Sequence, residues 1–414
     1  MINIGEIKKS LLSALWFMLL TFPIMVIRVN TIDHTIQWRW ERLVWVGGAV
    51  FILSFAWRYL LRRRQASARQ TVMDIQTRGL VSHLLQRPRE IFQTPSVRRP
   101  AMGLALVFLL ALPLIFSWNR TILMTNVLIY VVLGLGLNIV VGLAGLLNLG
   151  YAAFFAVGAY SYALLNHHFG LGFWTVLPIG AGLGALFGIL LALPVLRLRG
   201  DYLAIVTLGF GEIIRLMLEN WNDFSFGPSG IDNIAPPGLF GLSLTLQQTH
   251  TFIYYLMIAL TTLTVVVVRR LENSRVGRAW VALREDEIAC QAMGIDKTKA
   301  KLSAFALGST WAGTAGVVFA AKQKFINPYS FTIWESIMIL CIVVLGGMGS
   351  IPGVMIGGLI MVLLPELLKE YADYRWLLFG AILVLMMVFR PGGIISDVRK
   401  AYAFEAEEEE PHHG

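Results

Sequence analysis

The chain has 414 residues, of which 57% are apolar and 14% are charged. Soluble domains usually carry about 25% charged residues, so this composition excludes a soluble fold. Its 34 Lys and Arg exceed its 25 Asp and Glu by nine. Such a positive surplus can bind nucleic acid, bind anionic lipid or fix the topology of a membrane protein, and the positions of the charges distinguish these uses. No Lys, Arg, Asp or Glu lies between Arg120 and Arg197, and so long an uncharged stretch belongs in lipid. The sequence therefore predicts an all-α polytopic membrane protein that contacts membrane lipid and no nucleic acid.

Twelve apolar runs are long enough to cross, or nearly cross, a hydrocarbon core of about 30 Å. They lie at 11–28, 43–61, 101–118, 121–141, 150–166, 173–196, 202–218, 251–268, 302–321, 331–349, 351–368 and 375–390. We interpret residues 1–100 as an accessory membrane segment with a basic loop and 101–395 as a ten-span core. Residues 396–414 are an acidic run with little to bury, which predicts a solvated tail.

The distribution of Lys and Arg among the loops predicts the orientation, because cationic loops stay in the cytoplasm. Residues 62–99 carry nine Arg, and residues 269–301 carry eight Lys and Arg. Residues 216–268 carry none. If the twelve spans cross the membrane in alternate directions and the two basic loops lie in the cytoplasm, both termini are also in the cytoplasm.

Glycine spacing predicts where helices pack closely. Gly180, Gly184 and Gly188 lie four residues apart, and Gly353 and Gly357 repeat that spacing. On a helix this spacing puts the glycines on one face, where neighbouring backbones can approach each other.

Residues 132–160 hold the densest glycines of the core and two asparagines, which predicts a broken or re-entrant helix. Non-helical backbone at membrane depth persists only where protein or a water-filled cavity satisfies its polar groups. The stretch therefore either lines a passage or packs irregularly between helices. The candidate passage residues are Asn138, Gly145, Asn148, Gly150 and Glu212.

Ionisable residues inside the apolar spans are few. Glu212 and Arg215 lie three apart on one predicted helix, where their charges can neutralise each other. Because proton relays are built from such residues, their scarcity argues against a proton-coupled carrier. Sodium sites made from backbone carbonyls stay open as an alternative.

The loop at 269–301 predicts two short helices. Trp280 belongs to the first, which ends near Arg284, and Asp286 caps a second that stops at Gly294. Two cytoplasmic helices with a charged and an apolar face form a docking surface, whereas a helix lying on lipid is the alternative. The sequence contains no phosphate-binding loop and no catalytic constellation, so we expect no enzyme and no cofactor or metal on this chain.

The chain resembles permease subunits of ABC importers for branched-chain amino acids, in particular the larger of the two homologous permeases. The matching stretches are 136–160, 197–215, 277–296 (GRAWVALREDEIACQAMGID), 343–358 (VVLGGMGSIPGVMIGG) and 377–394. The resemblance implies a type II ABC importer core of ten helices, with about two extra helices before it. It also implies that 269–301 is the coupling loop to the ATPase. The coupling residues implied there are Gly277, Trp280, Arg284, Asp286, Glu287, Ala289 and Gly294.

The resemblance further implies the partners and the location of the chain. It implies a homologous shorter permease, two cytoplasmic ATPase subunits that bind the ATP, and a periplasmic binding protein that delivers leucine, isoleucine or valine. The expected location is the bacterial inner membrane. Another small polar substrate, such as urea, an amide or another amino acid, is an alternative, as is a secondary transporter that works without ATPases.

The charge asymmetry gives a direct test of the topology. A cysteine at Ser229 should react with a membrane-impermeant thiol reagent in intact spheroplasts, whereas a cysteine at Ser67 should not, because the arginine-rich loop around Ser67 stays inside. The unsubstituted chain gives the background labelling. The reverse labelling pattern would contradict the topology.

Overall fold

The computed structural model describes only part of the chain. The described residues are 27–30, 35–38, 109–113, 117–198, 200–238, 245–371, 375–389 and 392–395. The chain divides into two compact units, Met1–Leu104 and Ala105–Gly414. The predicted spans at 11–28 and 43–61, the basic loop and the acidic tail lie outside the described residues, apart from the last two residues of the first span.

The described part of the first unit is a two-stranded hairpin. Strand β1 (Ile27–Asn30) pairs antiparallel with β2 (Thr35–Trp38), so that Ile27 lies opposite Trp38. Both strands contain β-branched residues, which favour extended backbone. The sequence did not predict this hairpin, and Ile27 and Arg28 belong to β1 rather than to a helix.

The second unit is helical, and each predicted core span from 121–141 onward coincides with a helix. The membrane-type helices are α5 (Trp118–Leu137), continued by the π-helix η1 (Asn138–Leu143), α6 (Tyr151–Phe169), α7 (Phe173–Val195), α8 (Gly200–Asn220), α10 (Leu246–Glu272), α13 (Lys297–Gln323), α14 (Ile333–Gly346), α15 (Ile351–Leu367) and α16 (Arg375–Phe389). Short elements join them: α9 (Asn222–Ser225), η2 (Gly227–Ser229), α11 (Arg275–Glu285), α12 (Glu287–Ala292), η3 (Pro328–Phe331) and η4 (Leu368–Tyr371). Five of the described spans are long and apolar enough to cross a membrane, so the fold is that of an all-α polytopic membrane protein.

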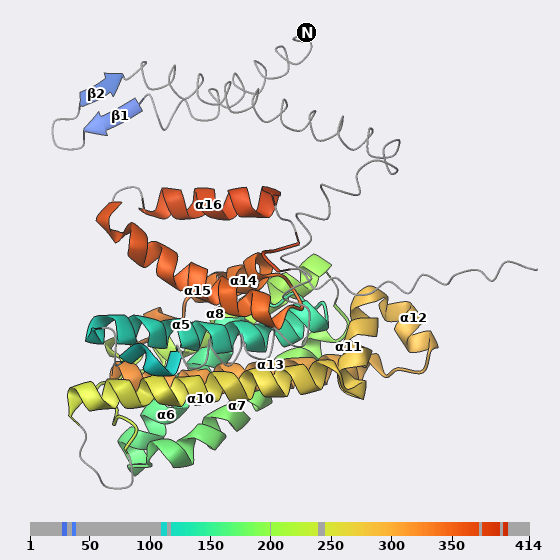
Figure 1. Ribbon diagram of the computed structural model, residues 1–414, viewed down its shortest axis with the longest axis horizontal. Helices are drawn as coiled ribbons and strands as arrows, with labels where there is room; N and C mark the ends of the chain where they lie inside the picture. Colours follow the sequence, from blue (N-terminus) through green and yellow to red (C-terminus); the bar gives the residue numbers. More distant parts are fainter. Residues whose placement is uncertain are drawn as a thin grey trace, which may run out of the picture. The chain divides into compact units, whose positions relative to one another are not determined.

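Helix α13 is the centre of this unit, since α5, α6 and α7 all pack against it. In the most apolar 18 residues of the span formed by α5 and η1, 89% of the residues are buried, whereas 33% are buried in the corresponding stretch of α7. Helix α5 is therefore an inner helix and α7 an outer one. Helices α11 and α12 project at one end of the long helices α10 and α13 (Figure 1).

The predicted glycine face of α7 is confirmed as a close contact with α13. A Cβ added at Gly184 would lie 2.6 Å from the carbonyl oxygen of Ser309. A Cβ at Gly188 would overlap the side chain of the same serine, and one at Gly180 would overlap Val317. The two backbones approach this closely only because these side chains are absent.

The second glycine pair joins α15 to α14. Gly353 lies against the carbonyl of Gly346, and Gly357 lies against the carbonyl of Ile342. The prediction of close packing from the four-residue spacing is therefore confirmed here as well.

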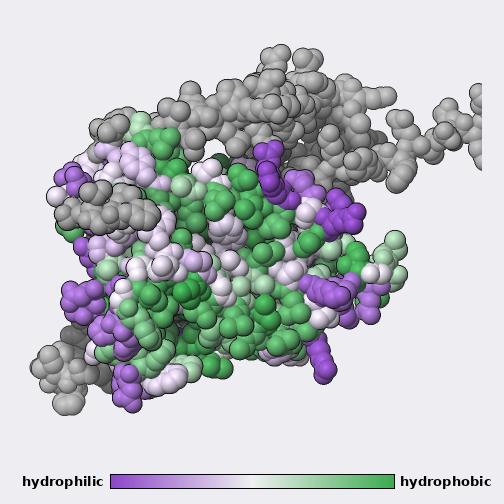
Figure 2. Space-filling model, turned by 90° about the horizontal axis from the view of Figure 1, so that it is seen from below, coloured by the Kyte–Doolittle hydropathy of each residue, from purple (hydrophilic) through white to green (hydrophobic). Residues whose placement is uncertain are grey.

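The outer surface carries many exposed apolar side chains. Figure 2 shows a broad hydrophobic face with the hydrophilic residues gathered mainly toward its edges. On α7 the exposed side chains include Leu186, Leu190 and Leu193. Large contiguous apolar surfaces on a soluble monomer are rare, whereas lipid tails cover such a surface without cost.

Gly184→Val should weaken the α7–α13 contact, because overpacking a filled interface typically costs about 1–3 kcal/mol. Gly182→Val on the same helix is the matched control, since Gly182 is exposed and a Cβ there has no neighbour within 4 Å. Thermal unfolding of the detergent-solubilised protein measures both variants. Equal stability of the two would contradict the packing described here.

Candidate functional site

The core contains a break in its helical backbone where the sequence predicted one. Helix α5 continues into the π-helix η1, and regular helix then stops until α6 begins at Tyr151. Residues 144–150 form no regular element. The prediction of a broken helix within 132–160 is therefore confirmed. We call residues 138–150 the broken segment.

Side chains from other helices satisfy the backbone of the broken segment. The Leu149 N–H donates to Thr207 Oγ1 of α8 at 3.1 Å, and the Ala152 N–H, just beyond the segment, donates to Ser336 Oγ of α14 at 2.9 Å. Unpaired backbone groups at membrane depth cost several kcal/mol each. The break is thus stable only where α8 and α14 supply these hydroxyl groups.

The two asparagines support backbone rather than facing an open passage. Asn138 Oδ1 accepts from the Gly349 N–H at 2.9 Å, and Asn148 Oδ1 accepts from the Gly150 N–H at 3.0 Å. Both side chains are fully buried. Within the described part of the chain, neither side-chain nitrogen has a hydrogen-bond partner.

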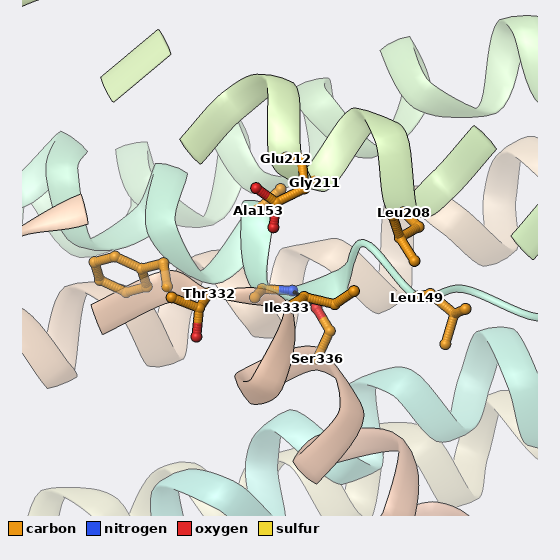
Figure 3. Close-up of a pocket in the computed structure, with 10 residues that line it drawn as sticks. Leu149, Ala153, Leu208, Gly211, Glu212, Thr332, Ile333 and Ser336 are labelled. Atoms are coloured by element: carbon orange, nitrogen blue, oxygen red, sulfur yellow. Dashed lines mark hydrogen bonds between the residues drawn. The ribbon is translucent and has the colours of Figure 1, made fainter. Parts of the chain in front are cut away.

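A small pocket opens where the end of the broken segment meets α8 and α14. Figure 3 shows Leu208 and Glu212 of α8 facing the first residues of α14, with Leu149 beside them. Gly150 allows this arrangement, since a Cβ there would overlap the carbonyl group of Thr207. Other lining residues are Ala152, Ala153, Gly211, Phe331, Thr332, Ile333 and Ser336. The lining is mainly apolar and holds one carboxylate, that of Glu212.

Glu212 belongs to a chain of charges along α8. Arg215 Nε lies 2.8 Å from Glu212 Oε2, which confirms the predicted pairing, and Arg215 Nη1 lies 2.6 Å from Glu219 Oε2. The Tyr329 hydroxyl donates to the other carboxylate oxygen of Glu219 at 3.0 Å. The Glu212 side chain is 31% exposed, so it is partly open to the pocket.

The cytoplasmic loop of the sequence prediction folds into two helices, each with a side-chain cap. The Ser274 hydroxyl accepts from the Gly277 N–H ahead of α11, and the Asp286 carboxylate accepts from the Ile288 and Ala289 N–H groups ahead of α12. The predicted cap at Asp286 is confirmed. Asp296 caps α13 in the same way, and the N–H of Lys299 is the main cause that lowers the pKa of that carboxyl group.

Several of the predicted coupling residues point inward. Trp280 is fully buried, and its Nε1 donates to Ala300 O and Ser303 Oγ, both at 3.0 Å. Gly277 is buried against the carbonyl group of Leu271. These two residues hold α11 against α13 and the end of α10.

Glu287 is also directed toward the core. Its carboxylate lies 3.0 Å from Lys301 Nζ, and this buried ammonium also donates to Leu196 O at the end of α7 at 3.1 Å. Cys290 is buried on the same helix, where desolvation and then the charge of Glu287 raise the pKa of its thiol. A raised pKa favours the unreactive protonated form of this cysteine.

The outer face of α12 is exposed and largely apolar. Ile288 is 68% exposed and Met293 is 83% exposed, with Ala289 and Ala292 exposed between them. Gly294 follows with a φ of 81°, which fits its predicted role as the stop of this helix. An apolar tip of this kind is suited to burial against another protein.

The predicted coupling helices and the broken segment contact each other through Arg284. Arg284 Nη1 donates to Gly142 O in the broken segment at 2.6 Å. Residue spacing alone gave no sign of this contact. Three supporting residues were not predicted from the sequence: Thr207, Ser336 and Lys301. A hydroxyl or ammonium group in or beside an apolar run indicates that the group needs an internal partner. Among the described residues, no three metal-ligating side chains gather.

Comparison with known proteins extends over most of the helical unit. The family model described as branched-chain amino acid transport system, permease component, matches residues 119–389. The high-affinity branched-chain amino acid transport system permease protein LivM of Salmonella typhimurium is 46% identical over 314 residues, which cover 71% of this chain and 74% of that protein.

Two further relatives align over a similar number of residues. LivM of Escherichia coli strain K12 is also 46% identical over 314 residues, covering 71% of this chain and 74% of that protein. The permease protein LivH of Salmonella typhimurium is 27% identical over 288 residues, which cover 64% of this chain and 91% of LivH. No solved structure matches this chain.

Thr207→Val should destabilise the broken segment by about 1 kcal/mol, because it keeps the side-chain volume but removes the acceptor of the half-buried Leu149 N–H. Thr310→Val is the matched control, since the Thr310 hydroxyl donates only to Ala306 O of its own helix. Thermal unfolding of the solubilised protein tests both variants. A Thr207→Val variant as stable as the control would mean that the hydroxyl does not support the break.

Proposed function

Because the chain belongs to the family of branched-chain amino acid transport system permease components, we propose that it is the larger permease subunit of an ATP-driven importer for leucine, isoleucine and valine. The observation that carries this proposal is the direct contact between the cytoplasmic helix pair and the broken segment. An importer needs both a surface that receives work from its ATPases and a movable element beside the substrate route.

The partners proposed are a homologous shorter permease, two cytoplasmic ATPase subunits and a periplasmic amino-acid-binding protein. The exposed apolar tip of α12 supports an ATPase contact, because Ile288 and Met293 have no apolar cover in the single chain. The sequence contains no phosphate-binding loop, which supports energy supply by partner subunits. The chain itself would then be no enzyme, and ATP would be bound by those partners.

The substrate route is proposed to pass the pocket beside Glu212. Its lining of Leu149, Leu208 and Ile333 suits an apolar side chain, and the carboxylate of Glu212 in its wall is balanced by Arg215. A passage that holds its cargo weakly releases it readily, so tight recognition would be left to the binding protein.

The location proposed is the bacterial inner membrane, with both termini in the cytoplasm. The Lys and Arg of 62–99 and 269–301 support this orientation. Residues 1–100 are proposed to be accessory to the core formed by 101–395.

Reconstitution in proteoliposomes tests the proposed function. The complete complex should take up leucine only when ATP is present on the side of the membrane that carries the ATPase subunits. Excess isoleucine or valine should compete with leucine for uptake, whereas urea should not. Leucine uptake by this chain alone, without ATPases, would indicate a secondary transporter and would overturn the proposal.

Ala289→Trp should disturb ATPase docking, because it places a large side chain in the centre of the exposed tip. Removing or blocking a well-buried interface contact typically costs about 1–3 kcal/mol, so we expect roughly ten-fold weaker retention of the ATPase subunits. Co-purification and ATPase stimulation by the binding protein measure the effect. The control is Leu190→Trp, at an exposed apolar position on the outer helix α7. Wild-type retention and stimulation with Ala289→Trp would mean that this loop is not the docking element.

A further inference from the structure

Arg284 lies where the cytoplasmic helix pair meets the broken segment. We propose that Arg284 is a positioning residue that fastens α11 to the broken segment, so that α11, α12 and residues 138–150 move as one body. The proposal rests on the proposed function, since it concerns how work at the ATPase contact reaches the pocket. Arg284 is exposed as a residue, but its guanidinium group forms its hydrogen bond within this chain, to Gly142 O, and the proposal gives the group that internal role rather than a contact with the ATPase.

The hydrogen bond of Arg284 occupies a carbonyl group that the break leaves without its helical partner. In an α-helix the Gly142 carbonyl would accept from the N–H of residue 146. Here the Leu146 N–H donates instead to Val140 O at 2.9 Å. Arg284 Nη1 takes the vacated position at 2.6 Å, and a hydrogen bond from a charged donor is among the stronger kinds in proteins.

The stem of Arg284 packs directly on the broken segment. A Cβ added at Gly145 would lie 2.7 Å from Arg284 Cγ and 3.0 Å from Arg284 Cβ. Gly145 also has a φ of 71°, which side chains rarely adopt. Glycine is therefore needed at 145 for two reasons, and the stem of Arg284 lies in contact with the backbone there.

The turn between α14 and α15 meets the same point. The Gly349 N–H donates to Asn138 Oδ1 at 2.9 Å, and a Cβ added at Gly142 would lie 2.6 Å from the same nitrogen. A Cβ at Gly349 would lie 3.7 Å from Arg284 Nη1. The arginine is therefore next to two non-helical stretches of the core, at 144–150 and at 347–350.

The other end of the connection reaches the pocket. Gly150 ends the broken segment against the backbone of Thr207, and Leu149 lines the pocket opposite Glu212. On the cytoplasmic side, Trp280 fixes α11 to α13 through its two hydrogen bonds. A displacement of α11 would thus reach the pocket wall through the contacts of Arg284 with the broken segment and of that segment with α8.

The first experiment measures coupling in the reconstituted complex. Arg284→Met keeps the packed stem and removes the hydrogen bond, and it should raise the number of ATP molecules hydrolysed per leucine imported about ten-fold. Arg284→Lys keeps a charged donor and should give an intermediate ratio. Arg275→Met is the matched control, since Arg275 is exposed at the start of the same helix, and it should keep the wild-type ratio.

The outcomes separate this proposal from the proposed function. A wild-type complex that imports no branched-chain amino acid contradicts the proposed function itself. If the wild type imports leucine and Arg284→Met keeps its ratio, only the role of Arg284 is wrong. Loss of the ATPase subunits from Arg284→Met complexes would assign the guanidinium to docking and would likewise overturn it.

The second experiment tests the rigid connection without replacing Arg284 or Gly145. Hydrogen–deuterium exchange of the reconstituted wild-type complex, with and without ATP, compares α11 with residues 144–150. The amides of the two elements should change their protection together, because Arg284 and Gly145 hold them in contact. A change in α11 with none in 144–150 would show that the two elements move apart, and would overturn the proposal.

Discussion

The structure depends on one constraint, that backbone polar groups at membrane depth must find partners within the protein. Regular helices meet it unaided, but residues 144–150 are not helical. Backbone groups in and next to this stretch form hydrogen bonds with the hydroxyl groups of Thr207 and Ser336 and with the guanidinium group of Arg284. Because these donors come from α8, α14 and α11, the break exists only when the core is assembled around it.

Assembly of that core depends in turn on close backbone contact. Lipid tails give no hydrophobic drive for helices to associate, so tight van der Waals packing has to replace it. Helix α13 meets α7 through Gly184 and Gly313 and meets α6 through Gly158 and Gly313. These glycines therefore bring α6 and α7 into close backbone contact with α13. The broken segment packs against the same helix through η1.

Helices α11 and α12 are tied to α13 and to the end of α7 by polar contacts. A buried ion pair is costly unless its remaining groups are also satisfied, and Lys301 meets this condition with both Glu287 and Leu196 O. Trp280 adds a second anchor on α13. The inner sides of α11 and α12 are thus held by these contacts, whereas Ile288 and Met293 belong to the side that is exposed.

The sequence by itself determined what acts over short chain distances. Composition and loop charges predicted the membrane fold, four-residue glycine spacing predicted close packing, and glycine density predicted the break. Asp286 was predicted as a cap because capping joins a side chain to N–H groups two and three residues ahead. Only the tertiary structure decided that Arg284 binds a carbonyl 142 residues away and that Trp280 points inward. Such partners are set by how distant helices pack, and no local periodicity records that choice.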